Sequence, residues 1–204
     1  MADITAKDIQ ALRKETGAGM MDAKRALTES DGDVERAKDL LREKGIAKVD
    51  KRSGREQGQG AVGVYMHVQA DRPVIGVLVG LASETDFVAK SDEFIRTAND
   101  IAMHAAAARP SWVSRVEVPP DAVAKEKALI AAEARNEGKP DEIIEKIVDG
   151  RINSFYKENV LVDQVFVRSD RFEGTVGELV QEVAIKMGEN ISITKMARVE
   201  IGEG

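Results

Sequence analysis

The sequence predicts an α+β fold in which a small helical module precedes an antiparallel sheet flanked by helices. Residues 1–46 repeat apolar side chains at helical spacing, whereas residues 61–81 form two valine-rich runs separated by a turn. Residues 47–60, between these regions, are polar, basic and rich in glycine, which is typical of a linker. We therefore expect a module over 1–46, a linker over 47–60 and a core domain over 61–204.

Turn signals divide the first region into three short helices. Thr5 and Asp8 have the spacing of a capping box. The Gly-Ala-Gly run at 17–19 ends this helix, residues 31–33 make a second turn, and we expect Gly45 to stop the third helix. Such a small bundle buries little surface, so its expected use is docking to another protein.

The basic residues of the linker leave a second interpretation open, a nucleic-acid-binding patch. They carry no interleaved aromatic residues, which single-strand binding surfaces use for stacking. The net charge of −6 also disfavours a broad phosphate-binding face. We expect no direct contact with nucleic acid.

The core begins with an antiparallel hairpin over 61–68 and 74–81. The helices that follow carry start and stop signals. A long helix runs from Ser91 to before Pro110, and a helical hairpin has its two arms before and after residues 138–141. The apolar run 160–167 predicts a strand, Thr175 and Glu178 cap a helix that ends at Gly188, and residues 191–201 predict a final strand.

Residues 83–90, SETDFVAK, follow the hairpin directly. Thr85 or Asp86 can cap a short helix there, since oxygen acceptors and negative charge are favoured at a helix N-terminus. Phe87 is unusual in such a polar first turn. Its ring either anchors the turn in the core or is presented to a partner, and the local sequence alone leaves both open.

Composition narrows the classes of function. Cysteine is absent, and the two histidines, His67 and His104, are far apart, which disfavours thiol chemistry and a histidine-based metal site. His104 lies in an alanine-rich helical run and is expected to be partly buried. The chain has no span-length apolar run and no signal-peptide pattern. We expect a cytoplasmic binding protein without membrane segment, cofactor or metal, and not an enzyme.

Several segments resemble bacterial elongation factor Ts, and they occur in the family's order along nearly the whole chain. Residues 12–27 (LRKETGAGMMDAKRAL) and 85–90 (TDFVAK) are the most specific. The other segments are 100–104 (DIAMH), 138–140 (GKP), 145–151 (EKIVDGR) and 188–191 (GENI). The length resembles the short members of the family, which have one core subdomain.

The resemblance implies a guanine-nucleotide exchange factor that acts on elongation factor Tu during translation, in both its GDP-bound and nucleotide-free states. It implies an N-terminal module with a fold like the ubiquitin-associated (UBA) domain. Positions matching Arg13, Met20 and Met21 would pack on the partner's nucleotide domain, and His104 would also touch the partner.

For the second motif, the resemblance implies a wedge beside the partner's nucleotide site. Asp86 and Phe87, within the segment Thr85 to Val88, would displace the partner's magnesium ion. The residues before this motif differ from the family pattern: Gly80 and Ala82 stand where Glu and Asn are usual, so their hydrogen bonds are missing. Val165 replaces a common proline.

Short members of the family also resemble homodimers paired through core strands, which in a chain without cysteine would be noncovalent. Two alternatives stay open. A UBA-like adaptor or a ribosome-associated chaperone subunit would account for residues 1–46 but not for 85–90. An enzyme using His104 with a carboxylate has little support in the sequence.

Overall fold

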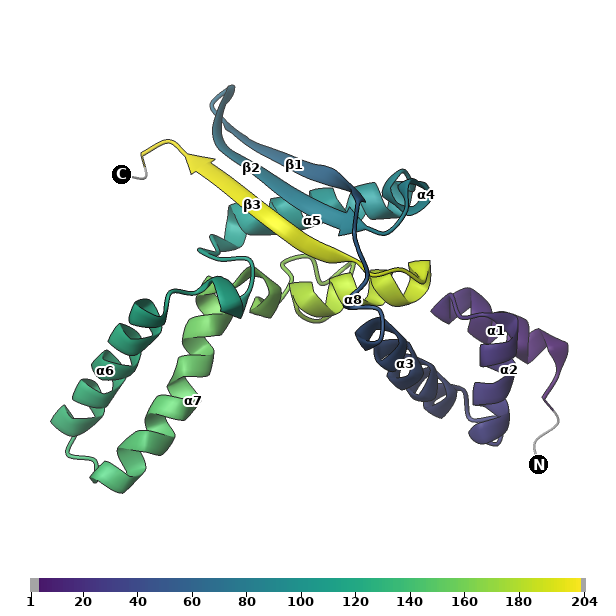
Figure 1. The fold of residues 1–204 in the computed structure, drawn as a ribbon, viewed down its shortest axis with the longest axis horizontal. Coiled ribbons are helices and arrows are strands. Elements are labelled where there is room, and N and C mark those ends of the chain that lie inside the picture. Colours follow the sequence, from purple (N-terminus) through teal and green to yellow (C-terminus); the bar gives the residue numbers. More distant parts are fainter. Residues whose placement is uncertain (1–3, 203–204) are drawn as a thin grey trace.

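A computed structural model describes residues 4–202 and has the predicted α+β architecture (Figure 1). A three-stranded antiparallel sheet has the order β1 (Gln59–Gln69), β2 (Arg72–Ser83), β3 (Ser192–Glu200). The helices are α1 (Ala6–Thr16), α2 (Met20–Glu29), α3 (Val34–Asp50), α4 (Asp86–Ala89), α5 (Asp92–Ala108), α6 (Pro120–Asn136), α7 (Asp141–Asn159) and α8 (Val176–Met187), with short 3₁₀ turns η1 (Arg115–Glu117) and η2 (Leu161–Asp163). The outermost residues of the expected first and last domains, 1–3 and 203–204, lie outside the described part.

The predicted hairpin is present and its turn explains its register. Strands β1 and β2 pair from Gln59 with Ser83 to Gln69 with Arg72. The two turn residues, Ala70 and Asp71, both have positive φ, 49° and 60°. Two consecutive left-handed residues match the twist of the flanking strands, which is why this kind of turn favours a tight hairpin.

Helix α5 covers one face of the sheet at very short range. A Cβ atom on Gly63 of β1 would stand only 2.0 Å from the backbone oxygen of Ala98 on α5. Only glycine permits that approach. The side chains buried around this contact include Val77, Val79, Leu81, Phe94, Ile101, Leu161, Phe166, Val176 and Val183.

The opposite face of the sheet is open. Side chains two residues apart point to the same face of a strand. On β1 those of this face are Val62, Val64, Met66 and Val68, each about half exposed or more. Leu78 of β2 and Val199 of β3 share the face through the register and are exposed too. An exposed apolar surface of this continuity is typical of an interface.

Helices α1, α2 and α3 have a small hydrophobic cluster of their own, centred on Leu12 and Leu27. As predicted, α1 starts at a capping box formed by Thr5 and Asp8, and it ends at Gly17 in the left-handed conformation. The likeness of this module to a UBA domain stays a prediction.

The prediction that Gly45 stops the third helix is wrong. Helix α3 continues through Gly45 to Asp50, into the segment expected as linker. The glycine is buried because α3 packs on α8 there: an added Cβ would lie 2.8 Å from the side chain of Ile185. A requirement for close packing, and not a helix stop, accounts for this glycine.

The predicted strand over 160–167 is also wrong. This segment forms η2 and then irregular structure with two isolated bridges, Trp112 to Val160 and Val165 to Thr175. Its buried side chains, Val160, Leu161 and Phe166, do not follow the alternation of a strand. The apolar run reflects a buried loop, which periodicity alone does not separate from a short strand.

The helical hairpin of α6 and α7 is confirmed and projects away from the sheet (Figure 1). Its arms are joined by Gly138 with φ of 73° and by an ion pair between Arg151 and Glu133. Within residues 4–202, none of the helices combines the length and the apolar character that crossing a membrane requires.

His104, for which the resemblance implies a partner contact, has its side chain fully buried on α5 in this structure, and the partner contact stays a prediction. Nε2 lies 2.9 Å from Oε1 of Gln164, and Nδ1 accepts a hydrogen bond from the backbone N–H of Val167 at 3.2 Å. The Gln164 amide nitrogen donates to two carbonyl oxygens, so its Oε1 is the acceptor for His104. This pattern specifies neutral imidazole with the proton on Nε2.

Burial lowers the pKa of His104 below its usual value of 6.5, and the Gln164 hydrogen bond opposes this shift only in part. The unfolded chain therefore takes up the proton first as pH falls. The stability from neutral His104 is fully present above about pH 6.5 and is lost as pH falls through the folded-state pKa.

We expect His104→Gln to flatten the fall in the free energy of unfolding between pH 7.5 and pH 5. One titrating proton contributes a slope of up to about 1.4 kcal/mol per pH unit. Urea titrations at several pH values, followed by circular dichroism, measure this slope. A His104→Gln slope equal to wild type would contradict the buried neutral imidazole.

Candidate partner-binding surface

The predicted short helix is present at the end of β2. Thr85 caps α4, with its hydroxyl oxygen accepting from the backbone N–H of Val88 at 3.4 Å. Asp86 stands at the first helical position, where negative charge is favoured. A hydrogen bond from Lys90 at 2.6 Å, together with the charge of that ammonium, lowers the pKa of Asp86. Ser91 then caps α5 and donates to the carbonyl oxygen of Val88, so α4 leads directly into the long helix.

Phe87 projects from this turn into solvent. Its side chain is 84% exposed, whereas the next two residues, Val88 and Ala89, are buried. The hydrophobic core therefore anchors the turn through Val88 and Ala89 and leaves the aromatic ring outside. The sequence left open whether Phe87 is buried in the core or presented to a partner. In this structure the ring is not buried in the core.

A polar cluster formed by Arg55, Glu84, Thr85, Glu189 and Asn190 holds the start of the turn; we call it the Glu189 cluster. The Glu189 carboxylate accepts from the backbone N–H groups of Glu84 and Thr85 at 3.0 and 3.1 Å. Its second oxygen accepts from the Thr85 hydroxyl at 2.5 Å. The capping residue is thus held by both its backbone and its side chain.

The Glu189 cluster also contains contacts in the opposite direction, from the residues after α8 to Glu84. The Glu84 carboxylate accepts from the backbone N–H of Asn190 at 2.6 Å and pairs with Arg55 at 3.2 Å. The Asn190 hydrogen bond and the Arg55 guanidinium lower the pKa of Glu84. The Asn190 side chain donates to the carbonyl oxygens of Arg55 and Ser53, at 3.0 and 3.4 Å. The turn, the end of α8 and the segment after α3 are therefore joined at one place.

The sequence did not predict this cluster. Residues 84–85 and 189–190 are more than 100 positions apart, so spacing carries no signal of their contact. One local signal existed: Glu189 and Asn190 directly follow Gly188, which ends α8 with φ of 75°. Polar side chains placed just beyond a helix C-terminus are in position to cap or join neighbouring segments.

The predicted docking residues of the N-terminal module are on its surface. Met20 and Met21 open α2 and are 52% and 68% exposed. Arg13 lies in the last turn of α1 and is exposed as well. Neither methionine belongs to the hydrophobic cluster of the module. Two consecutive residues therefore present flexible apolar side chains on the surface. Such side chains suit an adaptable interface.

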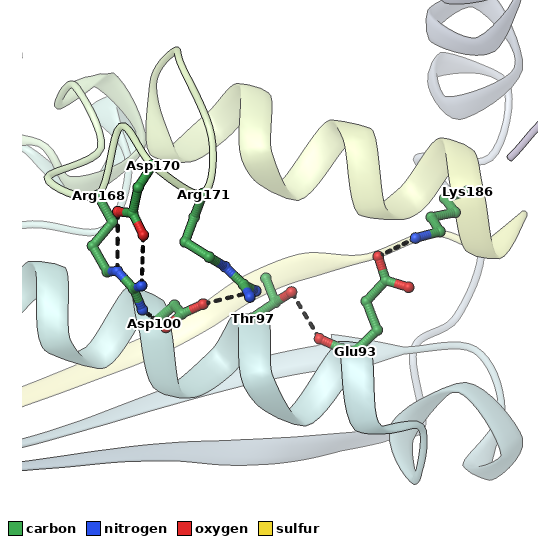
Figure 2. Close-up of polar contacts among 7 residues, drawn as sticks. All are labelled: Glu93, Thr97, Asp100, Arg168, Asp170, Arg171 and Lys186. Carbon is green, nitrogen blue, oxygen red and sulfur yellow. Dashed lines mark hydrogen bonds and ion pairs between the residues drawn. The ribbon is translucent and has the colours of Figure 1, made fainter. Parts of the chain in front are cut away.

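A second polar cluster fixes α5 to the C-terminal part of the core. Figure 2 shows Arg168 and Arg171 pointing from their loop toward Asp100 on α5, at 3.5 and 3.2 Å. Arg168 also pairs with Asp170 at 2.7 Å, and Lys186 of α8 pairs with Glu93 at 2.5 Å. These groups are paired with one another and orient the helices.

Two further features of the described residues bear on what kind of site the chain has. Among residues 4–202, no three or more His, Asp or Glu side chains are grouped so that they could hold a metal ion. A cavity of about 460 Å³ lies at the base of the α6–α7 hairpin, lined mainly by apolar groups that include Trp112, Leu129 and Phe155. None of the predicted site residues lines it. What the chain presents is an exposed aromatic ring on a fixed turn and an exposed methionine pair.

Comparisons with known proteins identify the family of the chain. The model of the family described as elongation factor TS matches residues 24–203. A protein of Alkaliphilus oremlandii named elongation factor Ts is 50% identical over 202 residues, covering 99% of this chain and 91% of the relative. Proteins of the same name from Geobacter sulfurreducens and Moorella thermoacetica are 49% and 46% identical, each over 201 residues, 98% of this chain and 91% and 97% of the relatives. The chain therefore belongs to the elongation factor Ts family.

Proposed function

We propose that the chain is a guanine-nucleotide exchange factor for elongation factor Tu, and that it works in the cytoplasm during translation elongation. The single observation that carries the proposal is Phe87, an aromatic ring left in solvent on a capped and anchored turn. Family membership supports the choice of partner. Single exposed apolar side chains are common on protein surfaces, so the support comes from where this ring lies, on a capped turn that the core anchors at Val88 and Ala89.

In the proposed mechanism the ring and the adjacent Asp86 carboxylate enter beside the partner's nucleotide site and displace its magnesium ion. The segment from Thr85 to Val88 forms the wedge. A magnesium ion joins the nucleotide phosphates to protein side chains, so its loss removes a large part of nucleotide affinity. Linkage then requires that GDP weaken the chain's binding by the same factor. Exchange becomes faster in both directions, and this chain performs no covalent step.

The N-terminal module supplies the first contact in this proposal. Met20 and Met21 would pack on the nucleotide domain of the partner, and Arg13 would add a polar contact at the rim. We keep the division into a UBA-like docking module over 1–46, a connection over 47–60 and a core over 61–204 that carries the wedge, although α3 extends to Asp50 and β1 begins at Gln59. His104 would act indirectly, because its buried ring fixes the backbone at Val167.

The open face of the sheet supports a noncovalent homodimer as a further part of the proposal. A patch that pairs with its own copy around a twofold axis must be complementary to itself, and a flat apolar sheet face meets that condition. The four exposed side chains of β1 line the face. Each protomer of such a dimer would present one wedge.

We expect Phe87→Ala to slow release of labelled GDP from elongation factor Tu by at least about tenfold, since the ring supplies contacts made only when the nucleotide leaves. Its melting temperature should stay close to wild type because the ring is exposed. Phe94→Ala is the matched control: this ring is fully buried, so its loss should cost about 3–5 kcal/mol of stability. Wild-type exchange by Phe87→Ala would contradict the wedge.

The double variant Met20→Ala/Met21→Ala should weaken the complex about tenfold, or about 1.4 kcal/mol, by removing two exposed contacts. Isothermal titration calorimetry with nucleotide-free elongation factor Tu measures the dissociation constant of the complex. Leu129→Ala truncates an exposed apolar side chain on α6 and serves as the control with unchanged affinity. An unchanged dissociation constant for the methionine variant would count against docking through α2.

For the homodimer, Val62→Lys should shift the chain toward monomer, because a charge on the open sheet face would be buried unpaired in the interface. Sedimentation velocity at several concentrations distinguishes the two states. Val116→Lys, at a site on η1 that is 93% exposed, should leave the dimer intact. A wild-type chain that stays monomeric at every concentration would rule out this part of the proposal.

A further inference from the structure

The exposed turn that carries Phe87 is too short to be stable by its own hydrogen bonds. Helix α4 has four residues, and an isolated helical turn of that length is unfavourable in water. At the end of β2, Gly80 and Ala82 bring no polar side chain, and Ser83 contributes one hydrogen bond, from its hydroxyl to the carbonyl oxygen of Thr85 at 3.1 Å. The core anchors the far end of the turn through Val88 and Ala89, so further contacts at its start must complete its orientation.

The Glu189 cluster meets this requirement, and we propose that Glu189 is a positioning residue that orients the Phe87 wedge before the partner arrives. The inference rests on the proposed exchange function. Glu189 closes three hydrogen bonds onto the two residues that precede α4, through the backbone N–H groups of Glu84 and Thr85 and the Thr85 hydroxyl.

The Thr85 hydroxyl connects Glu189 to the helix itself. Its single proton is donated to Glu189, so its lone pairs are free for the N–H of Val88. The rotamer that caps α4 is thus the one that Glu189 selects. Phe87 lies between the two ends of this chain of hydrogen bonds, one residue before Val88.

The cluster also fixes the wedge relative to the helices of the N-terminal module. Asn190, next to Glu189, donates to the carbonyl oxygens of Ser53 and Arg55 in the segment that follows α3. Glu84 accepts from Asn190 and pairs with Arg55, which also offsets the repulsion between the two carboxylates of the cluster. The Glu189 cluster therefore connects the segment after the docking helices to the turn that carries the wedge.

The physical consequence is a larger fraction of molecules with the ring in the competent orientation. If removal of Glu189 lets the turn sample other conformations, the step that inserts the wedge slows by the fraction lost. The contacts to the segment after α3 come from Asn190 and Glu84 and not from Glu189, so docking through Met20 and Met21 should be preserved. Glu189 should thus affect the maximal exchange rate and not the concentration of chain that half-saturates it.

The test combines a measurement on the free chain with exchange kinetics. In Glu189→Ala, the amide protons of Glu84 and Thr85 should exchange with solvent at least about tenfold faster than in wild type, since both lose their acceptor. Glu182→Ala, an exposed carboxylate on α8 without an ion pair within residues 4–202, is the matched control and should leave these amides protected. Unchanged amide exchange in Glu189→Ala would overturn the inference.

In the GDP-release assay, Glu189→Ala should lower the maximal rate about tenfold and leave the half-saturating concentration within about twofold of wild type. Glu189→Gln keeps one oxygen acceptor for the two backbone N–H groups and should recover the rate to within about threefold of wild type. A merely structural loss would instead raise the half-saturating concentration and lower the melting temperature as well.

The double variant Glu189→Ala/Phe87→Ala separates positioning from an independent contact. If Glu189 acts through Phe87, the double variant should be no slower than Phe87→Ala alone. A further tenfold loss in the double variant, or a wild-type rate for Glu189→Ala, would overturn the inference. If the wild-type chain does not accelerate GDP release, the proposed exchange function is wrong. If the wild-type chain accelerates release and Glu189→Ala does so equally well, only the role of Glu189 is wrong.

Discussion

The packing of α5 against one face of the sheet is the constraint on which the rest of the structure depends. Gly63 lets the helix backbone approach β1 at a distance that no other residue would allow. The apolar residues of β2 and α5 fill the space around that contact, and His104 is enclosed with them. Helix α5 covers one face of the sheet, and the side chains of the other face are exposed. To reach the covered face from the end of β2, the chain must turn at the end of the sheet. Phe87 lies on that turn.

Polar contacts then fix the orientation of segments that the hydrophobic core does not orient by itself. Ion pairs between exposed side chains are individually weak, and those around Asp100 mainly keep α5 and its neighbouring loop in register (Figure 2). The Glu189 carboxylate differs because it binds backbone N–H groups, whose direction is fixed by the chain. It can therefore define an orientation and not only add stability. A protein that acts by presenting a side chain needs this kind of fixed geometry more than it needs reactive groups.

The sequence was most informative where a local rule decides the structure. Capping residues set the starts of α1, α4 and α8, and the hairpin followed from two apolar runs around a turn. It failed where tertiary contacts decide. Gly45 resembles a helix stop in the sequence, but its packing against Ile185 of α8 accounts for it. The run 160–167 can be buried as a loop because its backbone N–H groups donate to Trp112, Val113 and Gly174, and that of Val167 donates to His104. The Glu189 cluster joins segments too distant in the chain for any spacing rule. The exposure of Phe87 is likewise decided by tertiary packing, because Val88 and Ala89 occupy the core and leave the ring outside.

Release of labelled GDP from elongation factor Tu, measured with and without the chain at millimolar magnesium and again after chelation, tests the wedge most directly. If the chain acts by displacing the ion, it should accelerate release strongly in magnesium and by a much smaller factor once the ion has been removed, because the two effects then share one contribution to affinity. Equal acceleration in both conditions, or none in magnesium, would contradict displacement of the ion by the Phe87 turn.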